Sequence, residues 1–230
     1  MRIDIVTIFP EMFRDVFEFG ILSRARDRGI VDLSAHDLRK WTTDRHRTTD
    51  DSPYGGGPGM VMKIEPLVAA VEELAAKSGI DSSKRRIILL SPRGEPLSQP
   101  KIRLLSAAEH VVLVSGRYEG VDERFVVATG AEEISIGDYV LSGGEIPAMV
   151  VADALVRLLP GALADPASAQ HDSFSDSVLD HPHYTRPALF RGLRVPEVLL
   201  SGDHAAVDVW REQRALEDTR ARRPELLQSS

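Results

Sequence analysis

Short runs of aliphatic and β-branched residues alternate along the chain with stretches in which apolar residues recur every three or four positions. The short runs are predicted to be strands, at residues 3–9, 31–36, 86–90, 111–115 and 133–136. The longer stretches are predicted to be helices, at residues 64–77, 98–109, 121–129 and 145–159. This alternation predicts an α/β domain with a mostly parallel sheet covered on both faces. Ligands of such sheets bind beyond the carboxyl ends of the strands.

The pattern changes after Gly161. Residues 162–177 are rich in Ala, Ser and Asp and have no apolar periodicity, so they are predicted to be a mobile linker. Residues 203–219 again have helical spacing, which includes Trp210 and Leu216. We therefore expect an α/β domain at 1–161, a linker at 162–177 and a small α-helical domain at 178–230.

Composition indicates an ordinary soluble protein. Of the 230 residues, 43% are hydrophobic and 27% are charged, and no apolar run approaches the ~20 residues that cross a bilayer. There is no cysteine, and the first residues enter a strand pattern rather than a signal-peptide pattern. These features predict a cytoplasmic protein with no membrane partner, no disulfide and no thiolate metal site. No residue is assigned as a metal ligand.

The net charge of -7 argues at first against a nucleic-acid partner. The acidic excess, however, lies in residues 130–180, where Arg157 is the only basic residue. Elsewhere acids and bases nearly balance, and arginines and lysines cluster at residues 24–28, 39–47, 84–86 and 220–223. These clusters could meet phosphates or could be solvated surface groups.

Glycines follow the three later strands of the predicted sheet, in residues 91–94, 115–120 and 135–144. The first strand ends without a glycine-rich turn, and no P-loop motif is present, which excludes the usual dinucleotide and P-loop sites. Any one of the three loops alone could be a plain turn. Together at one end of a sheet they predict a small-molecule pocket, because glycine lets the backbone approach a ligand closely.

Four strings carry a resemblance to a known family. They are Leu90-Ser91-Pro92, Ser115-Gly116-Arg117-Tyr118-Glu119-Gly120, Ser135-Ile136-Gly137-Asp138-Tyr139-Val140-Leu141-Ser142-Gly143-Gly144-Glu145 and His183-Tyr184-Thr185-Arg186-Pro187. In length, order and spacing they resemble the bacterial tRNA (guanine-N1)-methyltransferases, which are trefoil-knotted (SPOUT-type) RNA methyltransferases. The likeness covers nearly the whole chain. It implies a deep trefoil knot at the C-terminal end of the α/β domain, S-adenosylmethionine as methyl donor, and a homodimer with active sites between its subunits.

The resemblance also implies which residues form the cofactor pocket. They are Leu90, Ser91, Pro92, Gly116, Tyr118, Glu119, Gly120, Ser135, Ile136, Gly137, Tyr139, Leu141, Gly143, Gly144 and Pro147, with Asp180 reaching the cofactor of the partner subunit. Ile136 and Leu141 can sandwich an adenine, although both would also suit a core. Glu119 could orient the methionine end or help with a magnesium ion, and the sequence leaves open whether magnesium enters catalysis.

Two catalytic residues follow from the resemblance. Guanine N1 carries a proton that must leave before methylation, and the motif containing Asp172 makes that residue the general base. A free aspartate has a pKa of about 3.9, so Asp172 must be desolvated when RNA binds, or proton and methyl transfer must be coupled. Arg157 would stabilise the charge that develops on guanine O6. In isolation, Asp172 could be a capping or linker residue and Arg157 a solvated one.

A glycine loop lies within the long irregular stretch that is predicted at residues 38–62. We call residues 54–60 the 54–60 loop. The resemblance implies that it contacts the target guanine of tRNA through Gly55, Gly56, Gly57, Gly59 and Met60, although a plain surface loop is the alternative. Departures from the family pattern occur at Leu89, where an aromatic residue is frequent, and at His181, where a cysteine is frequent.

The expected function is methyl transfer to N1 of the guanosine immediately 3′ of the anticodon in tRNA. Two alternatives stay open: a knotted methyltransferase that acts on a ribose or on ribosomal RNA, and a non-catalytic RNA-binding protein with a vestigial pocket. Asp172 favours the first function, because ribose methylation gives no reason for an aspartate in this motif. A vestigial pocket gives no reason to keep both Asp172 and Arg157.

Overall fold

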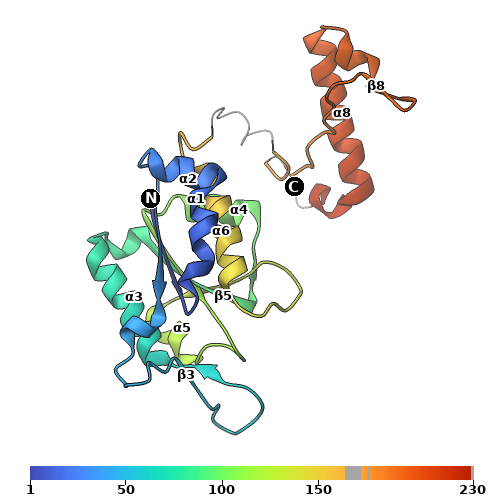
Figure 1. Ribbon diagram of the computed structural model, residues 1–230. Coiled ribbons are helices and arrows are strands. Elements are labelled where there is room, and N and C mark those ends of the chain that lie inside the picture. Colours follow the sequence, from blue (N-terminus) through green and yellow to red (C-terminus); the bar gives the residue numbers. More distant parts are fainter. Residues whose placement is uncertain (164–171, 176, 229–230) are drawn as a thin grey trace. The chain divides into compact units, whose positions relative to one another are not determined.

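The computed structural model describes residues 1–163, 172–175 and 177–228 (Figure 1). The chain divides into two compact units, Met1–Ala164 and Asp165–Ser230, and each is described here by itself. Most of the predicted linker at 162–177 lies outside the described residues, so the predicted domain limits stay a prediction.

A five-stranded sheet forms the centre of the first unit, in the order β2-β1-β6-β5-β7. All neighbouring strands are parallel. The strands are β1 (Arg2–Thr7), β2 (Asp32–Asp37), β5 (Arg85–Pro96), β6 (His110–Ser115) and β7 (Glu132–Ser135). Every residue of the central strand β6 is buried. The predicted α/β class with a parallel sheet is therefore confirmed.

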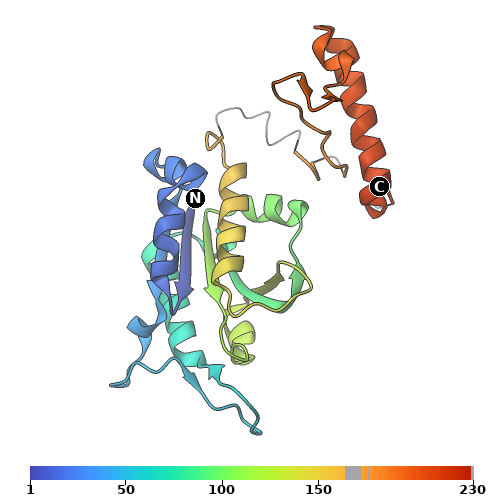
Figure 2. The ribbon, with the colours of Figure 1, turned by 45° about the vertical axis from the view of Figure 1, so that its right-hand side comes forward.

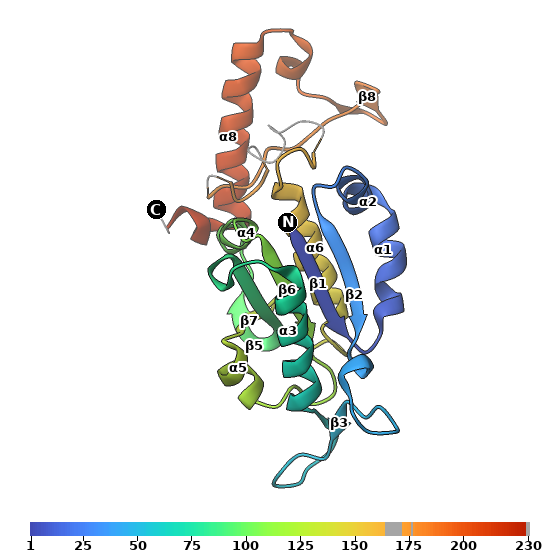
Figure 3. The same cartoon turned by 90° about the vertical axis from the view of Figure 1, so that its left-hand side faces the viewer.

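Helices cover both faces of the sheet (Figures 1 and 3). One face carries α1 (Arg14–Glu18), α2 (Gly20–Asp27), α4 (Gln99–Ser106) and α6 (Glu145–Leu158); the other carries α3 (Ile64–Ser78) and α5 (Arg124–Thr129). Side chains of successive strand residues point to opposite faces of the sheet. Ile3 and Ile5 therefore belong to the core under α1, α2, α4 and α6, and Val6 belongs to the core under α3 and α5. Both faces are buried, which explains the nearly continuous apolar runs of the strands.

Several elements begin or end away from their predicted limits. β1 ends at Thr7 instead of residue 9, because Pro10 opens the 3-10 helix η1 (Pro10–Phe13). β5 continues past residue 90 through a register shift, after which Glu95 pairs again with Ile134 of β7. α5 begins at Arg124 instead of residue 121, because Val121 is bridged to Met62.

Short elements escaped the sequence pattern, because they are too short to show a period. α1 and α2 are of this kind. The stretch predicted to be irregular at 38–62 contains η2 (Leu38–Trp41) and an antiparallel ribbon of β3 (Asp50–Asp51) with β4 (Val61–Met62). A further 3-10 helix, η3 (Ser82–Lys84), precedes β5.

The second unit is built on one long helix, α8 (His204–Arg222), which begins at its cap Asp203 (Figure 2). It also contains the ribbon of β8 (Leu189–Phe190) with β9 (Leu193–Arg194), and the 3-10 helices η4 (Glu197–Leu200) and η5 (Pro224–Leu227). The buried Thr219 hydroxyl of α8 accepts a hydrogen bond from the Leu179 N–H at 2.9 Å. This bond ties the segment before residue 184 to the helix. No helix among the described residues is long and apolar enough to cross a membrane.

Candidate functional site

A cavity of about 270 Å³ lies at the carboxyl ends of β5, β6 and β7. Its walls come from residues 89–93, from the glycine-containing loops that follow β6 and β7, and from the first turn of α6. Residues 91–94, predicted to be a loop, belong to the extended strand β5. The structure brings together here every predicted cofactor residue of the first unit: Leu90, Ser91, Pro92, Gly116, Tyr118, Glu119, Gly120, Ser135, Ile136, Gly137, Tyr139, Leu141, Gly143, Gly144 and Pro147. The predicted convergence of the loops is thus what the fold produces.

Two of these loops touch through their backbones. The Gly144 N–H donates to the Gly116 carbonyl at 2.8 Å, and Gly143 forms a β-bridge with Arg117. A Cβ atom at Gly144 would lie 2.7 Å from the Cα of Ser115, closer than real Cβ atoms approach backbone. Glycine at this position therefore lets the chain before α6 pass directly over the end of β6, which closes one side of the cavity.

The loop at residues 135–144 folds around Tyr139. Its N–H donates to the Gly137 carbonyl at 2.9 Å, and its hydroxyl donates to the Ile136 carbonyl at 3.1 Å. The neighbouring Val140 is 84% exposed, and Leu141 is 39% exposed. Apolar side chains that are this exposed to solvent, at the rim of a cavity, are available to contact a ligand or another protein chain.

An ion pair that the sequence analysis did not assign braces the cavity wall. The Arg117 Nε donates to Oε2 of Glu145 at 3.0 Å, and the Thr7 hydroxyl donates to Oε1 of the same carboxylate at 2.8 Å. Glu145 is only 1% exposed, and the Arg117 guanidinium lies 4.6 Å from the ring centre of Phe9. A charged residue at the start of a helix, directly after two glycines, was the only sequence signal for this pair.

The 54–60 loop is joined to the cavity wall. The Glu119 N–H donates to the Met60 carbonyl at 3.0 Å, and the Met62 N–H donates to the Gly120 carbonyl at 2.9 Å. A Cβ at Gly59 would lie 2.3 Å from Oε1 of Glu119, so the two segments are in close contact. The tip of the loop is open, with Tyr54 fully exposed. The fold thus places the predicted tRNA loop beside the predicted cofactor loop.

Tyr118 connects the same two regions. It lines the cavity. Burial has the largest effect on its phenol and raises the pKa, the nearby Asp50 carboxylate on β3 raises it as well, and the charge of Arg39 lowers it. The phenol is therefore protonated at neutral pH and can donate a hydrogen bond.

Arg157 lies away from the cavity of its own chain. It is in the last turn of α6, twelve residues beyond Glu145, which corresponds to about 18 Å along the helix axis. Arg157 is not among the described residues that line the cavity. One chain by itself therefore does not bring this predicted catalytic residue next to the predicted cofactor loops.

Asp172 and Asp180 belong to the second unit, where both line a separate cavity of about 620 Å³ against α8. Oδ1 of Asp180 lies 2.7 Å from Nδ1 of His181, and Oδ2 lies 2.8 Å from Nε2 of His183. Burial alone would raise the pKa of Asp180. Hydrogen bonds from His183 and from the His181 N–H lower the pKa by a larger amount, so the net shift is downward. Asp180 is therefore ionised at neutral pH.

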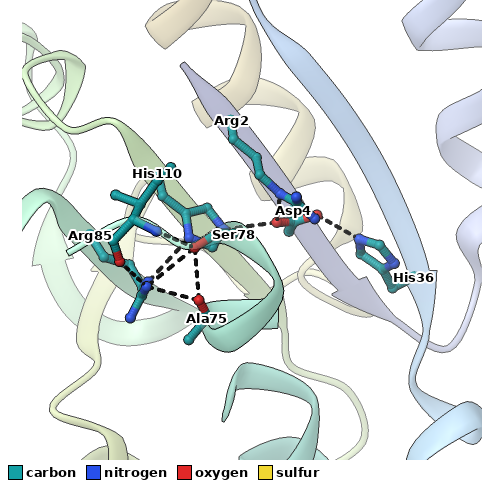
Figure 4. A network of polar contacts seen from close by, with 8 residues as sticks. Arg2, Asp4, His36, Ala75, Ser78, Arg85 and His110 are labelled. Carbon is teal, nitrogen blue, oxygen red and sulfur yellow. Dashed lines mark hydrogen bonds and ion pairs between the residues drawn. The ribbon is translucent and has the colours of Figure 1, made fainter. Parts of the chain in front are cut away.

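A buried polar network occupies the opposite, amino-terminal end of the sheet (Figure 4). Asp4 is fully buried and accepts hydrogen bonds from Arg2 at 2.6 Å, His36 at 2.7 Å and His110 at 2.8 Å. The Arg85 Nε donates to Nδ1 of His110 at 3.1 Å, which requires the proton of that ring on Nε2. Each carboxylate oxygen of Asp4 is therefore satisfied, and the network holds four strands together.

The fold and the first cavity define an α/β protein with a cavity at the carboxyl edge of a parallel sheet, the position at which such sheets bind small ligands. The family model described as tRNA (Guanine-1)-methyltransferase TrmD matches residues 1–229. The chain belongs to this family.

Curated relatives carry the name tRNA (guanine-N(1)-)-methyltransferase. One from Heliobacterium modesticaldum is 53% identical over 99% of this chain and 84% of that protein. One from Pseudomonas fluorescens is 53% identical over 100% of this chain and 90% of that protein. One from Methylococcus capsulatus is 55% identical over 99% of this chain and 89% of that protein. The predicted family and enzyme class are thereby confirmed.

Proposed function

We propose that the protein transfers the methyl group of S-adenosylmethionine to N1 of the guanosine immediately 3′ of the anticodon in tRNA, in the cytoplasm. The observation that carries the proposal is the cavity at the carboxyl edge of the sheet, lined by the glycine-rich loops. The names of the relatives support the choice of tRNA guanine N1 as the acceptor.

The wall chemistry fits S-adenosylmethionine. A volume of about 270 Å³ is close to the lower end of the roughly 300–1,000 Å³ that is usual for small-ligand pockets. Ile136 and Leu141 offer apolar surfaces for the adenine, and backbone groups near Gly137 and Tyr139 can read its edge. Glu119 would orient the methionine end. When bound, the cofactor supplies a methyl group already activated by its sulfonium.

Asp172 would remove the N1 proton of the guanine. It lines the cavity of the second unit together with Asp180, and removal of the proton would be coupled to methyl transfer or would follow closure by RNA. Base catalysis of this kind is worth about 10²- to 10⁴-fold in rate. The negative charge left on O6 is the group that Arg157 would stabilise.

A homodimer with shared sites is the arrangement that this geometry supports. Arg157 is about 18 Å along α6 from the helix end at the cavity, so a second copy is needed to complete the site. In the dimer, Arg157 and Asp172 of one subunit would act on the guanine beside the cofactor of the other. Asp180 would reach the same cofactor. The deep trefoil knot is proposed for the cavity region, where Gly144 passes closely over the end of β6.

The 54–60 loop would hold the target guanine through Gly55, Gly56, Gly57, Gly59 and Met60. A base must leave its stack to be methylated, and an open loop beside the cavity suits an extruded base. The bond between its Met60 carbonyl and the Glu119 N–H, with the neighbouring bond from Met62 to Gly120, would link tRNA binding to the cofactor loop. Magnesium would either assist at Glu119 or act only by folding the tRNA.

Labelling with radioactive S-adenosylmethionine tests the reaction. Purified protein should modify a tRNA transcript whose target guanosine follows another guanosine, with the label on N1. A transcript with adenosine at the target position is the matched control. Equal labelling of both transcripts would refute the proposal, and label on a ribose would favour the alternative methyltransferase.

Subunit mixing tests the shared site. Asp172→Ala subunits and subunits with Gly116→Val are each expected to be inactive as homodimers. Heterodimers of the two should recover partial activity, because one of their two sites has both halves intact. No recovery in heterodimers whose composition has been verified would count against sites between subunits.

A further inference from the structure

A cluster of three potential metal ligands lies in the second unit, on the segment before β8. Asp180, His181 and His183 place a carboxylate and two imidazole nitrogens within 4.8 Å of one another. The carboxylate lies between the rings, 2.7 Å from Nδ1 of His181 and 2.8 Å from Nε2 of His183. The ring centres of the two histidines are 4.5 Å apart. The three side chains therefore place their potential ligand atoms close together.

The donor set is typical of divalent transition metals. Two imidazoles and one carboxylate are the ligands of many open zinc sites, whereas Mg²⁺ and Ca²⁺ prefer oxygen. Each imidazole binds a metal through a ring nitrogen that carries no proton.

The backbone of the cluster is held in place. The Asp180 N–H donates to the Ser173 hydroxyl at 2.9 Å, and the Leu179 N–H donates to the Thr219 hydroxyl at 2.9 Å. Pro182 fixes the backbone between the two histidines, because its ring restricts φ. Positions fixed in this way lower the entropic cost of gathering three ligands around an ion.

The surroundings are negatively charged. Among the described residues, the cavity beside the cluster is lined by Asp172, Asp208 and Glu212 besides Asp180, and by one arginine, Arg211. Arg211 lies 3.2 Å from the carboxylate of Asp208, which offsets its charge. His183 is largely exposed, with 70% of its side chain open, so an ion can enter from solvent. Acids thus outnumber bases around the three ligands, which favours a cation.

We propose that Asp180, His181 and His183 bind one divalent transition metal ion of the Zn²⁺ type, with the open coordination positions facing the cavity. The ion replaces the two contacts between the carboxylate and the imidazoles. Each ring then carries its proton on the nitrogen that does not bind the metal. The donor atoms lie within 4.8 Å of one another. Small side-chain rotations would move each imidazole nitrogen away from the carboxylate oxygen that it now contacts, to the separations that bonds of about 2.0–2.2 Å require.

Trp210 offers an optical probe of this site. Its ring centre lies 6.5 Å from that of His181 and 6.2 Å from that of Tyr184. The experiment uses untagged full-length protein with Trp41→Phe, so that Trp210 is its sole tryptophan. Co²⁺ is titrated in the absence of cofactor and tRNA. Visible absorption of bound Co²⁺ and quenching of Trp210 should saturate together at one ion per chain, and Zn²⁺ should reverse both signals.

Single substitutions identify the ligands. His183→Asn and His181→Asn should each weaken Co²⁺ binding at least tenfold, whereas His204→Asn, at an exposed histidine of the same unit, should leave it unchanged. His181→Cys should retain the ion and add a thiolate-to-Co²⁺ charge-transfer band, because cysteine is also a metal ligand. Unchanged affinity in His183→Asn, or an equal loss in His204→Asn, would overturn the proposal.

The metal site and the proposed methyl transfer can fail independently. The titration needs neither S-adenosylmethionine nor tRNA, and circular dichroism shows whether each variant is folded. His183→Asn leaves the Asp180 carboxylate in place for its proposed contact with the cofactor of the partner. A protein that methylates tRNA but shows no saturable Co²⁺ signal would refute the metal site alone.

Discussion

Replacing Asp4 by Asn should destabilise the first unit strongly while preserving side-chain shape. Asp4 is fully buried, and both of its oxygens accept hydrogen bonds from Arg2, His36 and His110. The amide nitrogen of Asn can only donate, so at least one donor would face another donor. His110 cannot adapt by switching tautomer, because its Nδ1 already accepts from Arg85.

The expected loss is about 3 kcal/mol in the free energy of unfolding, since removing one partner of a buried charged network typically costs about 3–5 kcal/mol. Burial alone would raise the pKa of Asp4. The hydrogen bonds from His110, His36 and Arg2 together lower the pKa by a larger amount, so the net shift is strongly downward. The unfolded chain therefore binds this proton more readily than the folded one. The stabilisation is fully present above the unfolded pKa of about 3.9 and is lost as the pH falls through the folded pKa.

Urea unfolding at pH 7, 5 and 3 measures this prediction, with Trp210→Phe as background so that Trp41 of the first unit is the reporter. The midpoint should fall by about 1–3 M urea at pH 7, given about 1–3 kcal/mol per M in urea for small proteins. The variant should lose less stability, relative to its parent, at pH 3 than at pH 7. Asp32→Asn, the same change at an exposed position of β2, is the control. A loss at pH 7 as small as that of the control would refute the reasoning.

Three further substitutions probe the cavity wall. Gly144→Ala should weaken S-adenosylmethionine binding at least tenfold by calorimetry, because its Cβ would lie 2.7 Å from the backbone of β6. Glu145→Gln should lower the free energy of unfolding by about 1.5–3 kcal/mol in urea titrations, because it removes the charge that binds Arg117. Gly59→Ala should raise the KM for tRNA at least fivefold, because φ is +79° and the Cβ meets Glu119. Adding Glu119→Ala should then have a less than additive effect on binding.

Much of the fold was predictable because its strands and longer helices have clear periods. β6 was predicted almost residue for residue, since a central parallel strand is apolar on both faces. The C-terminal limit of β5 was not predictable, because Glu95 and Pro96 pair only after a register shift relative to β7. α1 was missed because five residues cannot show a helical period.

The candidate site, like the fold, has features that could be predicted from the sequence and features that could not. Glycines in residues 115–120 and 135–144 mark loops that follow strands, and the order of parallel strands brings these loops to one edge. The brace between Arg117 and Glu145 could not be predicted, because it joins residues 28 positions apart and depends on the close pass of Gly144 over β6. Asp180 was assigned to the cofactor of a partner subunit, and only the folded segment shows it between two histidines.

The sequence by itself determined the α/β class, the family and the glycine-containing segments that line the cavity, because these depend on local periodicity and on contiguous motifs. The tertiary structure decided which loops touch, where Arg157 lies relative to the cavity, and which side chains surround Asp180. Contacts of this kind join residues that are distant in sequence or set the rotation of neighbouring side chains. Both depend on the packing of the whole unit, which no local pattern encodes.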